Sequence, residues 1–135
     1  MKARVLFVCI ENSCRSQMAE ALSRKLGLDV LEPSSAGSRP ASQINPMAYE
    51  VMREIGYDLS GHRPKSVQDF RSQAYGYVIT MGCGDECPFI PAAHHEDWPI
   101  PDPKGQPIEA YRETRNEIER RIRDLTLRVK SHEPG

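Results

Sequence analysis

Apolar residues along the first third of the chain alternate between strand-like runs and helical stripes. Residues 4–8 form a short apolar run rich in β-branched side chains, which predicts a strand buried on both faces. From Ser16 the apolar residues fall four apart, and this spacing predicts a helix that stops at Gly27. A second strand is predicted over residues 29–31, and it leads into a turn of small residues at 34–37.

The remaining elements continue the alternation. Asn45 and Pro46 are typical of an N-cap and a first helical residue, and Gly56 closes the predicted helix. Residues 77–81 predict a further strand, and a proline-rich stretch follows from 88 to 107. A final helix is predicted with one apolar side, formed by Ile108, Tyr111, Ile118, Ile122, Leu125 and Val129.

Strands that alternate with helices predict an α/β fold with right-handed crossovers and a parallel sheet. The chain has 135 residues, which is the size of one domain, so we expect a single domain over residues 1–135. Ligands of such sheets bind beyond the carboxyl ends of the strands. Cys9 and Cys83 each follow a predicted strand directly, so we expect both cysteine loops at the same edge of the sheet.

Composition and charge exclude several classes of protein. The formal net charge is −1, which gives no electrostatic reason to expect a nucleic-acid or anionic-membrane partner. No stretch approaches the roughly 20 apolar residues of a spanning helix, and the N-terminus lacks the pattern of a signal peptide. We therefore expect a cytoplasmic protein, a monomer by its size, whose four cysteines are kept reduced and serve chemistry rather than disulfide scaffolding.

The segment between the first strand and the first helix has the features of an oxyanion-binding loop. Its backbone N–H groups can surround an anion at the positive end of the helix, and the same field stabilises a thiolate at Cys9. Arg15 can hold two oxygens of a tetrahedral anion, and the Ser16 hydroxyl can donate to the thiolate. Asn12 tolerates a left-handed backbone and can tie the loop. The alternative is a buried structural cysteine followed by a solvated arginine. The predicted loop comprises Cys9, Ile10, Glu11, Asn12, Ser13, Cys14, Arg15 and Ser16.

The run VLFVCIENSCRSQMAEA resembles the opening of thioredoxin-type arsenate reductases, which belong to the low-molecular-weight protein tyrosine phosphatase superfamily. The resemblance continues through residues 35–37, 45–48 and 52–58 and through Asp102-Pro103 into the last helix, so it covers most of the chain. It implies a four-stranded parallel sheet flanked by helices, with Cys9 as nucleophile and Arg15 as the clamp on the oxyanion. One residue departs from the pattern: Glu11 stands where glycine is usual, and its carboxylate would oppose an anion unless it pointed outward.

The other cysteines separate a reductase from a phosphatase. Both enzymes begin with attack by Cys9, but a phosphatase removes the adduct with water and a reductase removes it with a second thiol. Cys83 and Cys87 can supply a relay in which Cys83 attacks first and Cys87 then moves the disulfide to the surface. The glycines at 82 and 84 would let this loop change shape. A cysteine pair here is the mark of the arsenate reductases that the chain resembles, but its short spacing leaves the order of attack open.

Two alternatives to the relay remain for this second site. Cys83 and Cys87 can be inert core thiols, or they can bind zinc with His94 and His95, although the spacing matches common zinc sites poorly. We expect no metal, no cofactor and no redox step for Cys14, and we expect the two histidines to be solvated loop residues. Partners expected from the resemblance are arsenate, with phosphate or sulfate as analogues, and a thioredoxin, glutaredoxin or mycothiol-type reductant. The alternative function is hydrolysis of phosphate monoesters.

The resemblance also places two features near the anion loop. Asp102 matches the family's general acid, which can protonate a leaving oxygen. Tyrosine phosphatases usually carry an aromatic residue after this Asp-Pro, whereas this chain has Lys104, which weakens the case for a phosphotyrosine substrate. Some members hold a monovalent cation with groups that correspond to Asn12, Glu20, Ser35 and the segment around Lys65. The Lys65 ammonium would either take the place of that ion or point to solvent.

Overall fold

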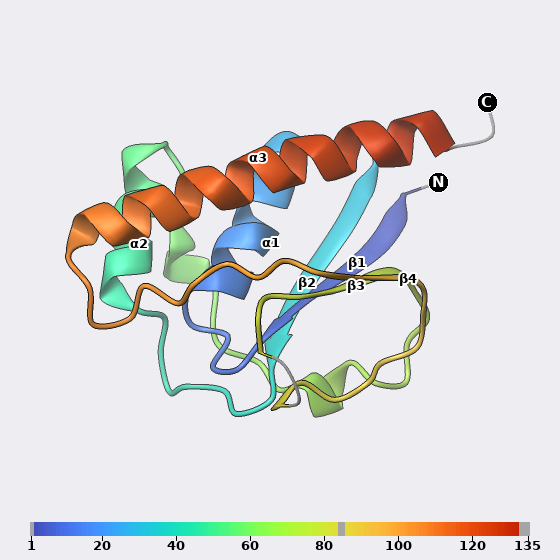
Figure 1. The fold of residues 1–135 in the computed structure, drawn as a ribbon, viewed down its shortest axis with the longest axis horizontal. Coiled ribbons are helices and arrows are strands. Elements are labelled where there is room, and N and C mark those ends of the chain that lie inside the picture. The colour runs from blue at the N-terminus through green and yellow to red at the C-terminus, as the bar shows by residue number, and fades with distance from the viewer. Residues whose placement is uncertain (1, 84–85, 133–135) are drawn as a thin grey trace.

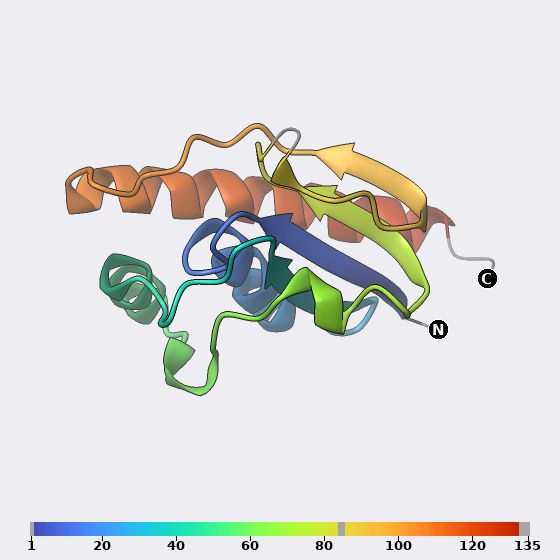
Figure 2. The same cartoon turned by 90° about the horizontal axis from the view of Figure 1, so that it is seen from below.

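The computed structural model describes residues 2–83 and 86–132 and contains one four-stranded sheet. The strands lie in the order β2-β1-β3-β4, and all three neighbouring pairs are parallel. Figure 2 shows all four arrowheads directed to the same end of the molecule. The predicted α/β class and the four-stranded parallel sheet are confirmed. The strands are β1 (Ala3–Cys9), β2 (Leu31–Gly37), β3 (Tyr75–Thr80) and β4 (Ala92–Asp97).

In the described part of the chain, three α-helices and two short 3₁₀ helices complete the fold. The α-helices lie on one side of the sheet and η2 lies on the other (Figure 1). No α-helix or 3₁₀ helix within the described ranges is long and apolar enough to cross a membrane. The elements are α1 (Arg15–Leu26), α2 (Pro46–Glu54), α3 (Ile108–His132), η1 (Leu59–Gly61) and η2 (Val67–Asp69).

Strand β1 is buried on both faces, as its continuous apolar run predicts. Val5 and Phe7 point into the core that the α-helices cover, whereas Leu6 and Val8 point into a smaller cluster with Val67 of η2. Successive side chains of a strand alternate between the faces, so this short run fills two apolar layers. Burial of this kind contributes about 25 cal/mol per Å² of apolar surface, and it anchors β1 in the centre of the sheet.

The predictions of a second strand over residues 29–31 and of a turn at residues 34–37 were wrong. Residues 34–37 form the carboxyl end of β2 itself, paired in register with β1 from Leu6 to Cys9. Small side chains suit this position because β2 ends against the anion loop. A Cβ atom on Gly37 would lie 2.6 Å from the carbonyl oxygen of Ile10, and the close backbone approach therefore requires glycine.

The expectation for the proline-rich stretch also needs correction, because β4 lies within it. His94 and His95 are strand residues, not loop residues, and they pair with Tyr77 and Val78 of β3. Both histidines are exposed, since β4 is an edge strand with little apolar surface to bury. A strand of this kind carries no alternating apolar pattern that a sequence could reveal.

Helices α1 and α2 end and begin at the predicted residues, but the physical reason at Gly27 differs from the one expected. The Asn45 side chain accepts from the backbone N–H of Met47 and caps α2 as expected. Gly27 ends α1, but its φ of −135° is not left-handed. A Cβ atom there would lie 2.9 Å from Oγ1 of Thr126, so this glycine allows α1 to pack closely against α3. The apolar side predicted for α3 is confirmed, with Ile118, Ile122 and Leu125 fully buried.

Candidate functional site

The loop between β1 and α1 curls around the Cys9 sulfur. Asn12 has a φ of +51°, a left-handed conformation that asparagine adopts more readily than most residues. Its backbone N–H donates to Sγ of Cys9 at 3.2 Å. The predicted left-handed backbone of Asn12 is confirmed, and the turn that it forms directs a backbone donor at the sulfur.

A short chain of side-chain hydrogen bonds supports the same sulfur. Nδ2 of Asn12 donates to Oγ of Ser16 at 2.7 Å, and Oγ of Ser16 lies 2.7 Å from Sγ of Cys9. Because the Ser16 oxygen accepts from Asn12, its own proton is free to point at the sulfur. Two groups of the loop, the Asn12 backbone N–H and the Ser16 hydroxyl, are therefore directed at the Cys9 sulfur.

Arg15 is almost fully buried and is held by the loops that follow β3 and β4. Its Nη1 donates to the carbonyl oxygens of Met81 and Ile100, the latter at 2.9 Å. Both bonds use one nitrogen, so Nε and Nη2 can turn their N–H groups to an anion. Nη2 also lies 3.8 Å from Oδ2 of Asp102. The guanidinium therefore joins the anion loop to the segment that carries the expected acid.

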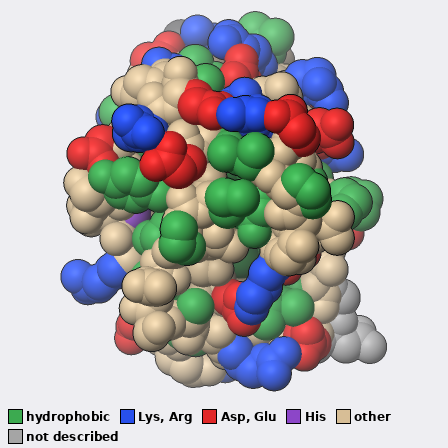
Figure 3. Space-filling view, turned by 90° about the vertical axis from the view of Figure 1, so that its left-hand side faces the viewer, with side chains coloured by type: hydrophobic (Ala, Val, Ile, Leu, Met, Phe, Trp, Pro, Cys, Tyr) green, Lys and Arg blue, Asp and Glu red, His purple; other side chains and the backbone are tan. Residues whose placement is uncertain are grey.

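These groups surround one small pocket at the carboxyl edge of the sheet. Figure 3 looks onto this end of the molecule, where the described acidic and basic side chains are interspersed rather than gathered by sign. Attraction for an anion must therefore come from the pocket's own donors, as the net charge of the chain implies. The pocket is lined by Cys9, Ile10, Glu11, Ser13, Cys14, Arg15, Asn45, Asp102 and Lys104.

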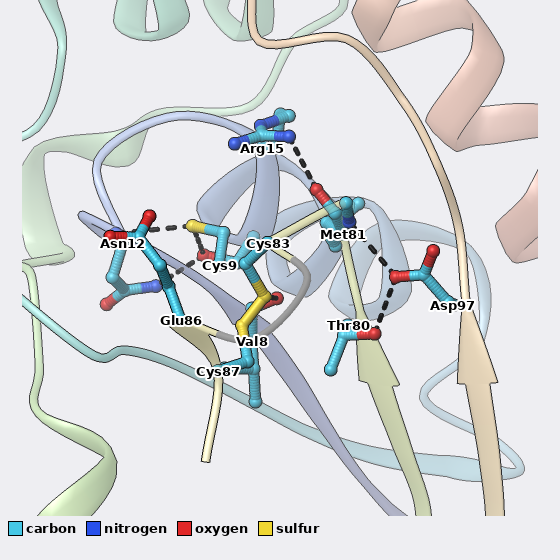
Figure 4. The surroundings of a disulfide bond; sticks show 12 residues. Val8, Cys9, Asn12, Arg15, Thr80, Met81, Cys83, Glu86, Cys87 and Asp97 are labelled. Carbon is cyan, nitrogen blue, oxygen red and sulfur yellow. Dashed lines mark hydrogen bonds between the residues drawn. A yellow bond between two sulfur atoms is a disulfide. The ribbon is translucent and has the colours of Figure 1, made fainter.

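Cys83 and Cys87 form a disulfide beside this pocket (Figure 4). Sγ of Cys83 lies 3.9 Å from the carbonyl oxygen of Val8, the residue before Cys9. Cys83 is buried and Cys87 is partly exposed. Gly82 has a φ of +79°, so the chain turns away from β3 through a conformation that favours glycine. Gly84, the other glycine expected to matter here, lies outside the described residues.

Cys14 behaves differently from Cys9 although both lie in the anion loop. Burial, together with the charges of Asp102 and Cys9, raises the pKa of the Cys14 thiol well above its usual value. A protonated thiol is a poor nucleophile. This environment supports the expectation that Cys14 takes no redox step.

The Lys65 side chain is directed at Glu20. Its Nζ lies 3.4 Å from Oε1 of Glu20 and 3.5 Å from Oγ of Ser35. Ser35 also donates to the same carboxylate oxygen at 2.6 Å, and the Lys65 backbone N–H donates to Oδ1 of Asn12 at 2.8 Å. The ammonium thus provides positive charge among groups that the resemblance associated with a cation, and through Asn12 this cluster contacts the anion loop.

Replacing Lys65 with methionine is expected to destabilise the protein by about 1–3 kcal/mol at pH 7, because the buried Glu20 carboxylate loses its ammonium. Burial raises the pKa of Glu20, but Lys65, Ser35, His62 and Arg24 together outweigh burial and hold the pKa below its usual value. A depressed carboxyl pKa stabilises the fold above the unfolded-state pKa, and this contribution is lost as pH falls through the folded-state pKa.

Urea unfolding of wild type and Lys65→Met at pH 7, 5 and 4 would measure this effect. The difference in unfolding free energy should shrink as the pH falls below about 5, where a glutamate of the unfolded chain begins to be protonated. Lys25→Met, which removes an exposed lysine of α1, should show no such pH dependence. A Lys65→Met penalty that stays constant down to pH 4 would contradict the assigned role of Glu20.

A polar network that no sequence motif indicates lies behind the anion loop. Nε2 of Gln17 donates to Oδ1 of Asn12 at 2.9 Å and to the carbonyl of Arg63 at 2.9 Å. Oε1 of Gln17 lies 3.0 Å from Nδ1 of His62, whose Nε2 lies 2.8 Å from the hydroxyl of Tyr57. Burial lowers the pKa of His62, although Glu20 opposes this shift. Neutral His62 can then donate to Gln17 and accept from Tyr57.

Nothing in the sequence marks these residues as a group, because they come from separate elements. Gln17 comes directly after Ser16, the last residue of the anion loop, and this position next to the loop is its one signal in the sequence. Asn45 was expected only as a helix cap, but it also lines the anion pocket. Among residues 2–83 and 86–132, no three His, Cys, Asp or Glu side chains form a group that could hold a metal ion. The zinc alternative therefore finds no ligand set in that part of the chain.

The chain is similar in sequence and in structure to known proteins. Residues 4–134 match the family described as low molecular weight phosphotyrosine protein phosphatase. A glutaredoxin arsenate reductase of Synechocystis is 36% identical, over 93% of this chain and 98% of the relative. The solved structure of an arsenate reductase in the phosphate binding state has a TM-score of 0.86 at 35% identity, covering 96% of this chain and 99% of that one. A thioredoxin-dependent arsenate reductase of Corynebacterium glutamicum has a TM-score of 0.82 at 39% identity, covering 98% of this chain and 64% of that one.

Proposed function

Because this chain belongs to the low-molecular-weight phosphotyrosine protein phosphatase family, and because its second cysteine loop carries a disulfide beside the nucleophile, we propose that it is an arsenate reductase. The Cys83–Cys87 disulfide is the observation that carries the proposal. Hydrolysis of a phosphoester needs only Cys9, Arg15 and an acid. When this pair is reduced, its thiols can supply the electrons that reduction of arsenate needs and that hydrolysis does not use.

The first step is nucleophilic attack by the Cys9 thiolate on the arsenic atom of arsenate. Arg15 and the backbone N–H groups of the loop hold the remaining oxygens, and a sulfur–arsenic bond replaces one arsenic–oxygen bond. Asp102 lines the same pocket, and in this proposal it protonates the oxygen that leaves as water. The product of this step is an arsenate thioester of Cys9 in which arsenic is still pentavalent.

The second step is the redox step. The Cys83 thiolate attacks Sγ of Cys9, a Cys9–Cys83 disulfide forms, and the sulfur–arsenic bond breaks. Its electron pair stays on arsenic, which leaves as trivalent arsenite, so the two thiols together lose two electrons. The contact between Cys83 and Val8 supports Cys83 as the first attacker, because it places this sulfur next to the end of β1.

Regeneration proceeds by thiol–disulfide exchange. Cys87 attacks Cys83, which frees Cys9 as a thiolate and leaves the Cys83–Cys87 disulfide. Cys87 is partly exposed, so a thioredoxin, a glutaredoxin or a small thiol such as mycothiol can attack the pair from solvent. We propose a monomer working in the cytoplasm, where such reductants are maintained.

Two assays on the wild-type chain test this function. Arsenate is expected to cause continuous NADPH oxidation in the presence of thioredoxin and its reductase, with arsenite as product. Phosphate is the matched control, because thiols do not reduce pentavalent phosphorus, so it should bind without consuming NADPH. Hydrolysis of para-nitrophenyl phosphate should have a kcat/KM at least about 100-fold lower than that for arsenate.

The second candidate function is hydrolysis of phosphate monoesters. It is favoured by Asp102, which lines the pocket together with Cys9 and Arg15 and can serve as the acid of a phosphatase. Rapid release of para-nitrophenol, together with no consumption of NADPH in the presence of arsenate, would replace the reductase by this alternative.

A further inference from the structure

An ion pair crosses the anion pocket between two loops that are far apart in the chain. Nζ of Lys104 lies 2.9 Å from Oε1 and 3.0 Å from Oε2 of Glu11, so the ammonium contacts both carboxylate oxygens. Glu11 belongs to the loop after β1, and Lys104 follows the Asp102-Pro103 segment. Both side chains line the same pocket as Cys9 and Arg15. We call this pair the Glu11–Lys104 bridge.

The backbone on the Lys104 side of the bridge is fixed. The backbone N–H of Lys104 donates to Oδ1 of Asp102 at 3.0 Å, and the backbone N–H of Gln106 donates to the carbonyl of Pro103 at 2.9 Å. The other carboxylate oxygen of Asp102 faces Arg15. The turn therefore presents the Lys104 side chain and the expected acid to the same pocket.

Fold stability does not explain this pair. The side chains of Lys104 and Glu11 are 61% and 39% exposed, and exposed ion pairs contribute little to stability. A carboxylate in the wall of an anion pocket repels the anion unless a cation neutralises it. The hydrogen bond to Glu11 raises the pKa of Lys104, so the ammonium is charged at neutral pH. The ion pair therefore has two consequences for the pocket. Lys104 neutralises the Glu11 carboxylate, and the two side chains occupy the space between their loops.

The two ends of the bridge lie at positions where this chain differs from two groups of enzymes: Glu11 from the loop of the arsenate reductases that it resembles, and Lys104 from the tyrosine phosphatases. Glycine is usual at position 11, where it adds no side chain to the pocket. In tyrosine phosphatases an aromatic residue is usual at position 104, where it can stack on an aryl ring. In this chain the Glu11 side chain fills the space that a glycine would leave, and Lys104 stands in place of the aromatic ring. The two side chains bind each other. An aryl phosphate must project its ring out of the loop between these positions, whereas an inorganic oxyanion has no such substituent.

We propose that the Glu11–Lys104 bridge makes the pocket selective for unsubstituted tetrahedral oxyanions and excludes aryl phosphates. This rests on the proposed function only in taking the Cys9–Arg15 loop as the anion site. Opening the bridge should therefore improve binding of an aryl phosphate relative to inorganic phosphate, whichever reaction the pocket catalyses.

Calorimetric titration of the full chain tests this selectivity. Each protein also carries Cys9→Ser, so phenyl phosphate binds without turnover. The quantity measured is the Kd of phenyl phosphate divided by the Kd of inorganic phosphate. This ratio is expected to fall about tenfold in Glu11→Ala, in Lys104→Ala and in the double variant. Each variant removes the ion pair between the two loops and so leaves space for the phenyl ring. Lys130→Ala removes another exposed lysine–carboxylate pair, with Asp29, and should leave the ratio unchanged.

The two single variants should differ in their affinity for inorganic phosphate, because each removes a charge of opposite sign. Lys104→Ala leaves the Glu11 carboxylate unneutralised, so the Kd of inorganic phosphate should rise about three- to tenfold at low salt and recover at high salt. Glu11→Ala should not weaken phosphate binding, and adding it to Lys104→Ala should remove the loss. A loop that had merely collapsed would show no such rescue.

Three results would overturn the proposal: an unchanged ratio in all variants, equal losses of both anions, or no binding of either anion. Reduction of arsenate is measured separately on chains with Cys9 intact. A fallen ratio without arsenate reduction would keep the bridge as the selectivity element and reject the proposed function alone.

Discussion

Replacing Cys9 with serine is expected to abolish arsenate turnover, with a loss on the order of 10³-fold or more. A serine hydroxyl is a far weaker nucleophile than a thiolate at neutral pH, and the donors around position 9 cannot supply the missing sulfur. The backbone N–H of Asn12 and the hydroxyl of Ser16 still have an oxygen acceptor in the variant. The fold and the binding of phosphate should therefore survive while NADPH oxidation with arsenate stops.

Calorimetry with phosphate and thermal unfolding distinguish loss of chemistry from loss of structure. Cys14→Ser is the comparison within the same loop, since Cys14 is buried and its pKa is raised. Its loss of kcat should be about tenfold or less, as expected for a residue that shapes the loop without reacting. A Cys9→Ser variant that still reduces arsenate at a measurable fraction of the wild-type rate would show that another thiol is the nucleophile.

The second large effect concerns the order of the cysteine relay. When reduced Cys87→Ser protein is mixed with arsenate and no reductant, it is expected to release a single equivalent of arsenite and stop as a Cys9–Cys83 disulfide. Cys83→Ser is expected to release none, because no thiol attacks the Cys9 adduct. Both variants should lose steady-state turnover with thioredoxin by about 100-fold or more.

Rapid quenching with an alkylating agent, followed by mass analysis of the peptides, identifies each disulfide. Wild type under the same conditions should release one equivalent and end with the Cys83–Cys87 pair that the structure contains. The opposite pattern, with arsenite from Cys83→Ser and none from Cys87→Ser, would reverse the order of attack. Full turnover by both variants would refute the relay.

Much of the candidate site could be predicted from the sequence because its residues are local. Asn12, Arg15 and Ser16 follow Cys9 within a few residues, and a strand before them with a helix after them restricts how the segment can fold. The left-handed Asn12 and the contact between Ser16 and Cys9 were expected from residue chemistry alone, and the structure contains both.

Two strands show where local pattern fails. Small residues at the end of β2 are typical of a turn, yet pairing with β1 and the approach of Ile10 to Gly37 make them a strand. β4 is exposed at the sheet edge and contains polar residues, so its hydrogen bonds to β3 define it rather than any apolar alternation. Tertiary context overrides propensity at both places.

By itself, the sequence determined the β1–loop–α1 unit with Cys9 as its proposed nucleophile, because every group that shapes this unit lies within one short segment. Only the tertiary structure decided what faces that nucleophile. It placed Cys83 against Val8, anchored Arg15 on Met81 and Ile100, and joined Glu11 to Lys104 across the pocket. Each of these contacts spans more than sixty residues. Parallel strands that end at one edge bring such residues together, and no spacing along the chain records that meeting.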